Sequence, residues 1–150
     1  MTIDAHAFSL AIRWLHVAAM AVAFGGAVLL AAATRTRGRT SFEGTLDFAA
    51  MYERAFWSAA GILVMTGVGN AAAFGAQLSL PESGWGQVFA AKLVTIAALL
   101  FLSVPRTLAV VHFDARAERG QADSTLARLY AATALGLVAI LAIAVWLAHG

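Results

Sequence analysis

The stretch AFSLAIRWLHVAAMAVAFGGAVLLAAA, residues 7–33, decides the fold, because only two of its 27 side chains are ionisable. A helix needs about 20 apolar residues to cross the hydrocarbon core of a bilayer. Three further stretches reach that length, at residues 55–77, 88–111 and 129–148. The sequence therefore predicts an all-α fold, in which residues 1–150 form one integral membrane bundle of four transmembrane helices.

The composition narrows the classes of protein that this chain fits. Of its 150 residues, 61% are hydrophobic and 12% are charged, which is far from an ordinary soluble domain. With no cysteine, the available metal ligands are histidine, methionine, carboxylate and backbone groups. The arginines stand in short connections and form no basic face, so we expect the lipid bilayer as a partner and no nucleic acid.

Arginines flank two of the three connections between the apolar stretches. They are Arg35, Arg37, Arg39 and Arg54 at the first connection, and Arg106, Arg116, Arg119 and Arg128 at the third. The second connection, residues 78–87, carries only Glu82. By the positive-inside rule, the first and third connections are cytoplasmic and both termini face the opposite, outer side. Helical periodicity before residue 55 also predicts that the second helix begins before it enters the membrane.

An ionisable side chain inside an apolar span indicates a functional site, because it is costly in hydrocarbon. His16 lies in the first stretch, one turn before Met20 and on the same helix face. Lys92, the only lysine, lies in the third stretch, and Asn70 lies on the second at a depth comparable to that of His16. We expect His16 and Met20, with Met65 nearer the midplane, as candidate metal ligands.

The same residues have a purely structural interpretation. His16 would then donate a hydrogen bond to a carbonyl or to Asn70 and order the bundle. Met20 and Met65 would fill gaps in the packing, as methionine commonly does. Lys92 would extend its ammonium toward the interface and anchor the helix. The functional interpretation instead makes His16, Lys92 and Asn70 the residues that bind a cofactor, and it identifies no catalytic residue.

Short motifs along the chain resemble the membrane domain of the copper resistance D (CopD) family. They are Arg13-Trp14-Leu15-His16, Gly25-Gly26, Thr66-Gly67-Val68-Gly69-Asn70, Gly84-Trp85-Gly86-Gln87 and Ala91-Lys92-Leu93. The resemblance runs from Phe8 to Thr107, and the fourth stretch matches in hydropathy only. It implies a multi-pass protein of the bacterial inner membrane that is associated with uptake or handling of copper from the periplasm. Together with the orientation expected from the arginines, this puts both termini on the periplasmic side. Full-length members usually have more helices, so this chain resembles a minimal version that would need to oligomerise. We expect a homo-oligomer or a larger membrane redox complex.

The chain is also similar to the HemJ-type protoporphyrinogen oxidases, which are small four-helix proteins thought to bind haem b. His16 and Lys92 match the first-helix histidine and third-helix lysine of that family. The residues before the lysine, and the polar segment before the last helix, depart from its pattern. Three functions therefore stay open, with copper or haem b as the expected cofactor: a CopD-like metal-handling protein, a HemJ-like oxidase, or a structural or assembly subunit of a respiratory complex.

Overall fold

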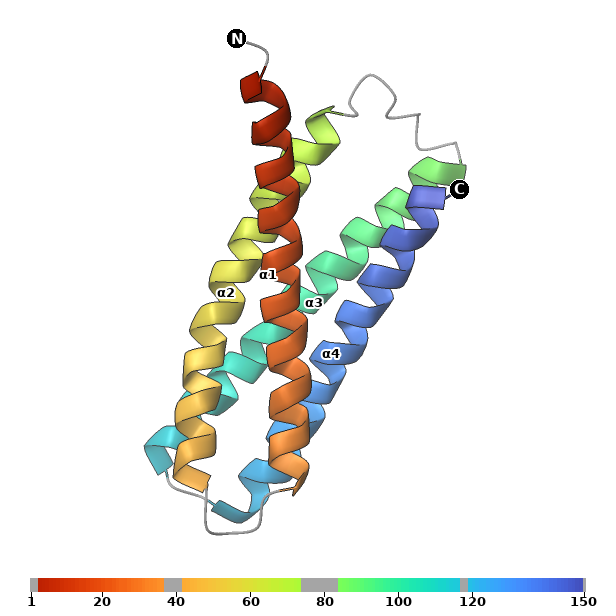
Figure 1. Ribbon diagram of the computed structural model, residues 1–150. Coiled ribbons are helices and arrows are strands. Elements are labelled where there is room, and N and C mark those ends of the chain that lie inside the picture. Colours follow the sequence, from red (N-terminus) through yellow and green to blue (C-terminus); the bar gives the residue numbers. More distant parts are fainter. Residues whose placement is uncertain (1–2, 37–41, 74–83, 117–118, 150) are drawn as a thin grey trace.

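The computed structural model describes residues 3–36, 42–73, 84–116 and 119–149, and each of these ranges is one helix. They are α1 (Ile3–Thr36), α2 (Phe42–Ala73), α3 (Gly84–Arg116) and α4 (Arg119–His149). Helices that follow one another in sequence run antiparallel, so the start of α1 and the end of α4 lie at the same end of the bundle (Figure 1). We call this the terminal end of the bundle. The opposite end, where α1 and α3 end and α2 and α4 begin, is the connection end. The predicted all-α bundle of four helices is confirmed in the described part of the chain.

The four helices pack around the bundle in chain order. α1 packs against α2 and α4, α4 packs against α3, and the contact between α2 and α3 is the smallest of these four. Figure 1 shows the pair α1 and α2 diverging from the pair α3 and α4 toward the terminal end. The axes of these two helix pairs are therefore farther apart at the terminal end than at the connection end.

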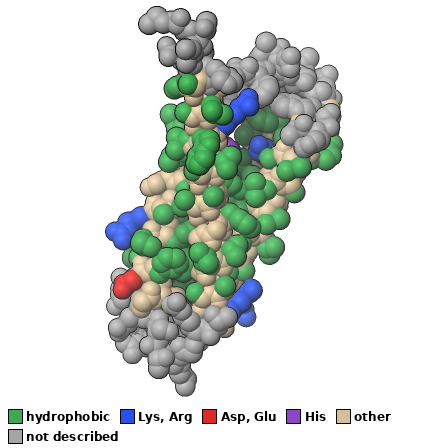
Figure 2. All heavy atoms as spheres, viewed as in Figure 1, with side chains coloured by type: hydrophobic (Ala, Val, Ile, Leu, Met, Phe, Trp, Pro, Cys, Tyr) green, Lys and Arg blue, Asp and Glu red, His purple; other side chains and the backbone are tan. Residues whose placement is uncertain are grey.

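The outer surface of the bundle suits lipid rather than water. Three helices are long and apolar enough to cross a membrane, over Ala7–Arg35, Gly86–His112 and Ser124–Leu147. α2 has 32 residues and packs beside them, but within the described residues it is not one of the three. Large apolar side chains lie on the outside of the bundle, for example Phe101, which is 78% exposed. Hydrophobic side chains cover much of the face in Figure 2. An apolar surface of this extent indicates contact with a bilayer, and we conclude that this is a membrane protein.

The helices extend beyond the predicted apolar stretches. α2 begins at Phe42, which confirms that the second helix starts well before residue 55. Its predicted end at residue 77 lies outside the described residues. A helix satisfies its backbone hydrogen bonds in water as well as in lipid. The length of an apolar stretch therefore predicts the spanning part of a helix and does not fix its ends.

Small residues on α1 allow α2 to approach closely. Ala23 and Ala27 are buried one turn apart, and Gly26 faces the ring of Tyr52 on α2. A Cβ atom at Gly26 would overlap the Cδ2 and Cε2 atoms of Tyr52. The Tyr52 hydroxyl donates a hydrogen bond to the Ala23 carbonyl, at 2.7 Å. This contact holds the Tyr52 ring edge-on against Tyr130 of α4, with 5.6 Å between ring centroids.

Candidate functional site

A cavity of about 690 Å³ lies among the helices in the terminal half of the bundle. All four helices contribute to its 22 lining residues, and only His16 and Lys92 among these have polar side chains. Figure 2 shows a hollow in the upper half of the molecule, with histidine and basic side chains beside it. The volume is in the range of about 300–1,000 Å³ that is typical of small-molecule sites. The cavity is therefore an apolar chamber with two ionisable groups.

His16 is held in place by a hydrogen bond from α1 to α2. Its Nδ1 atom lies 2.7 Å from the Oγ1 atom of Thr66. The Thr66 hydroxyl also donates a hydrogen bond to the Ile62 carbonyl one turn earlier, at 2.6 Å. A hydroxyl has a single proton, and the Thr66 hydroxyl already donates it to the Ile62 carbonyl. Thr66 therefore accepts a hydrogen bond from His16, whose ring carries its proton on Nδ1.

This arrangement leaves the other ring nitrogen of His16 without a proton. In a neutral imidazole with the proton on Nδ1, the Nε2 atom has a free lone pair. That atom is the one available to bind a metal ion or to accept a hydrogen bond from a ligand in the cavity. Metal-binding histidines are typically oriented in the same way, by donating their second ring N–H to a fixed acceptor.

The structure brings three of the five predicted site residues together. His16, Met20 and Lys92 all line the cavity. Met65 is 76% exposed and does not line it. The backbone of Asn70 belongs to α2, but its side chain lies outside the described part of the structure. The hydrogen-bond partner of His16 that is described is Thr66, in place of the carbonyl or Asn70 considered from sequence.

The donor atoms at the cavity fit some metals better than others. The described residues contain no group of three or more histidine, cysteine, aspartate or glutamate side chains that could hold a metal ion. Zinc requires about four nitrogen, sulfur or oxygen donors, and calcium needs more. One imidazole with a nearby thioether suits Cu(I), and one imidazole suits an axial position of haem iron. Among the described residues, this donor set is therefore chemically closer to what copper or haem iron requires than to what zinc or calcium requires.

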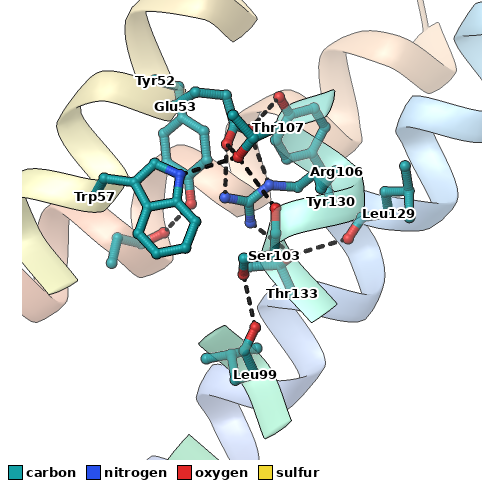
Figure 3. A network of polar contacts seen from close by, with 11 residues as sticks. Tyr52, Glu53, Trp57, Leu99, Ser103, Arg106, Thr107, Leu129, Tyr130 and Thr133 are labelled. Atoms are coloured by element: carbon teal, nitrogen blue, oxygen red, sulfur yellow. Dashed lines mark hydrogen bonds and ion pairs between the residues drawn. The ribbon is translucent and has the colours of Figure 1, made fainter. Parts of the chain in front are cut away.

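A second polar site lies toward the connection end, below the cavity. Arg106 of α3 is fully buried and pairs with Glu53 of α2. Its Nε atom donates to Oε1 at 2.8 Å and its Nη2 atom donates to Oε2 at 3.0 Å, which is a bidentate pair. Its Nη1 atom donates to the Thr133 hydroxyl of α4, at 2.8 Å. Figure 3 shows the guanidinium held among these side chains.

The Glu53 carboxylate accepts two further hydrogen bonds. The Tyr130 hydroxyl donates to Oε1 at 2.9 Å and the Thr107 hydroxyl donates to Oε2 at 2.7 Å. The Trp57 indole donates in turn to the Thr107 hydroxyl, at 3.0 Å. Every buried side-chain nitrogen or oxygen in the described residues has a partner. Because this network is fully bonded, we interpret it as a clamp that ties α2 to α3 and α4.

Phe56 separates the cavity from this ion pair. Its side chain is 2% exposed and lines the cavity. The Cζ atom of Arg106 lies 4.2 Å from the centroid of the Phe56 ring, a cation–π contact. The Phe56 ring therefore closes the end of the cavity that lies nearest the ion pair, and its contact with Arg106 stabilises the position of the ring.

Sequence reasoning missed the Glu53–Arg106 pair. We counted Arg106 among the charges that flank a cytoplasmic connection, but the structure buries it inside the bundle. The signal was present, since Arg106 falls within the apolar stretch 88–111, where an ionisable residue indicates a site. The orientation of the bundle now depends on the other arginines and stays a prediction.

The fold defines a multi-pass helical membrane protein with an apolar cavity among its helices. The family model described as copper resistance protein D matches residues 46–147. The chain therefore belongs to the CopD family. The match includes α4, where we expected similarity in hydropathy only, and it begins after His16 and Met20. Comparison with curated proteins and with solved structures gave no match.

Proposed function

We propose that this CopD-family protein binds a redox metal through the Nε2 atom of His16 and handles copper at the periplasmic face of the inner membrane. Family membership favours copper over other metals. Met20 lines the same cavity one turn after His16 and offers a thioether, a ligand that suits Cu(I). Met65 points to the outside of the bundle, so we place Met20 ahead of it as the second ligand.

One observation carries this proposal, the hydrogen bond between His16 and Thr66. It fixes the imidazole in the tautomer that binds metals through Nε2. It also supplies the oriented second contact that commonly accompanies such a ligand, and whose loss typically weakens metal binding about 10- to 100-fold. A histidine that only ordered the bundle would not require a cavity beside it.

Haem b is the second candidate, because the cavity is larger than a metal ion needs. Its 690 Å³ and apolar walls suit a flat organic cofactor. His16 would then be an axial ligand, and Lys92 would pair with a carboxylate of the cofactor. A HemJ-like oxidase activity follows only from this second candidate.

The test is to purify four proteins in detergent: the wild type and the variants His16→Ala, Met20→Leu and Met65→Leu. Copper and iron are assayed, and optical spectra are taken before and after reduction with dithionite. We expect near-stoichiometric copper in the wild type, lost in His16→Ala, reduced in Met20→Leu and unchanged in Met65→Leu, which is the matched control.

The other outcomes separate the alternatives. A Soret band that disappears in His16→Ala would replace copper by haem b. Equal copper in the wild type and His16→Ala would contradict a site at His16. Neither metal in the wild type would leave the structural or assembly subunit as the remaining function.

A further inference from the structure

Lys92 is the charged group in this part of the molecule that the proposed copper site does not use. It is half-buried and lines the cavity. Within the described residues it is not part of an ion pair, whereas buried Arg106 is paired with Glu53. Burying a charge is costly unless an opposite charge or strong hydrogen bonds compensate it. The Lys92 ammonium therefore favours an anion in the cavity.

The described carboxylates are too far away to supply that anion. Their side chains are those of Asp47 and Glu53, both in the first half of α2 at the connection end. Glu53 is held by Arg106, which follows Lys92 by 14 residues on α3, about 21 Å along the helix axis. An anion at Lys92 must therefore come from a ligand or from a part of the chain that the structure does not describe.

The rest of the cavity selects for an apolar body on that ligand. Apart from His16 and Lys92, its walls are built from aliphatic and aromatic side chains, methionine and glycine. The lining extends along α3 from Phe89 to Leu100, about 16 Å at 1.5 Å per residue. Phe56 closes the far end against Arg106. A polar ligand would lose its hydration here without compensation.

We propose that the cavity binds an anionic amphiphile, with its apolar chain between the helices and its anionic head on the Lys92 ammonium. The chemistry is a single carboxylate or phosphate on a long hydrocarbon chain. A free fatty acid and an anionic membrane phospholipid both have it. The site goes beyond the proposed copper binding at His16 and Met20 and does not depend on it, because the two use different side chains.

The test compares ligands that differ in the charge of the head. Delipidated protein is titrated with oleate and with oleyl alcohol, and bound molecules are counted by native mass spectrometry. We expect oleate to bind one per chain and at least about tenfold more tightly than the alcohol, as for a charge-assisted hydrogen bond. Lys92→Met should remove this preference and Lys92→Arg should retain it. Arg13→Gln, which removes an exposed cation outside the cavity, is the control.

Three further measurements identify the source of the ligand and its position in the cavity. The mass of any lipid that co-purifies distinguishes a fatty acid from a phospholipid. Gly67 lines the cavity and an added Cβ there meets no atom within 4 Å, so Gly67→Leu should fill the space and block binding of both probes. Cross-links from an oleate with a photoreactive tail should fall near Phe56, and not on the outward-facing Leu108 or Leu135.

Two results would overturn the inference. One is equal binding of oleate and oleyl alcohol to the wild type. The other is an oleate preference that survives Lys92→Met. His16→Ala should still bind oleate, so loss of metal and loss of the amphiphile are measured separately, and either proposal can fail alone.

Discussion

Replacing Glu53 with glutamine removes the counter-charge of a guanidinium that is buried among three helices. The carboxylate accepts four hydrogen bonds, two from Arg106 and one each from Tyr130 and Thr107. An amide has one oxygen, so its NH₂ group must face two of these four donors. Breaking one partner of a buried ion pair costs roughly 3–5 kcal/mol. We expect Glu53→Gln to lower the free energy of unfolding by about 3 kcal/mol, more than a hundredfold in the folding equilibrium.

The assay is unfolding by SDS in mixed micelles, followed by tryptophan fluorescence. Trp57 donates to Thr107 within the network and so reports on it. The double variant Glu53→Gln/Arg106→Leu removes both charges, so neither charge is left buried without its partner, which is the costly consequence of each single change. The double variant should therefore lose less free energy of unfolding than Glu53→Gln and Arg106→Leu lose when their separate losses are added. A single-variant loss below about 1 kcal/mol, or strictly additive losses, would refute the description of this network as a charge clamp.

Three further changes have defined outcomes. Gly26→Ala should lower stability by about 1–3 kcal/mol in the same SDS titration, because the new methyl overlaps a tyrosine ring of α2. Gly25→Ala is the control and should not lower stability, because its Cβ meets no atom within 4 Å. Equal effects of the two changes would contradict this contact between α1 and α2. Thr66→Val should weaken metal binding about 10- to 100-fold, whereas Thr66→Ser should retain it. Competition with a chelator measures these affinities, and equal affinities of Thr66→Val and the wild type would exclude a role of Thr66 in orienting His16. Tyr130→Phe should cost about 1.5–3 kcal/mol by losing one hydrogen bond to the Glu53 carboxylate, and an unchanged unfolding midpoint would show that this bond is dispensable.

The sequence predicted the class of fold because apolar length is a strong signal. A stretch of about 20 apolar residues has few structures available other than a membrane-spanning helix. His16 and Lys92 were identified as site residues for a related reason, since an ionisable group in such a stretch is conspicuous. The same reasoning applied to Arg106. Because Arg106 lies near the third connection, we interpreted it instead as one of the charges that set the orientation of the bundle in the membrane.

Other features depend on three-dimensional packing and had no local signal. The partnership of Glu53 with Arg106 joins residues 53 positions apart, and nothing in either helix specifies it. The hydrogen bond from His16 to Thr66 depends on how α1 and α2 are rotated about their axes. The cavity exists because α2 and α3 make little contact, and no single stretch of sequence encodes that gap.

The most direct test of the metal site is a competition titration of Cu(I) between the purified protein and a chelator of known affinity, for the wild type and His16→Ala. We expect one tight site per chain in the wild type. Binding should be weakened in the variant by more than the roughly hundredfold that losing an orienting contact causes. Added imidazole should restore part of the affinity. Equal Cu(I) affinity of the two proteins would contradict the assignment of His16 as the ligand.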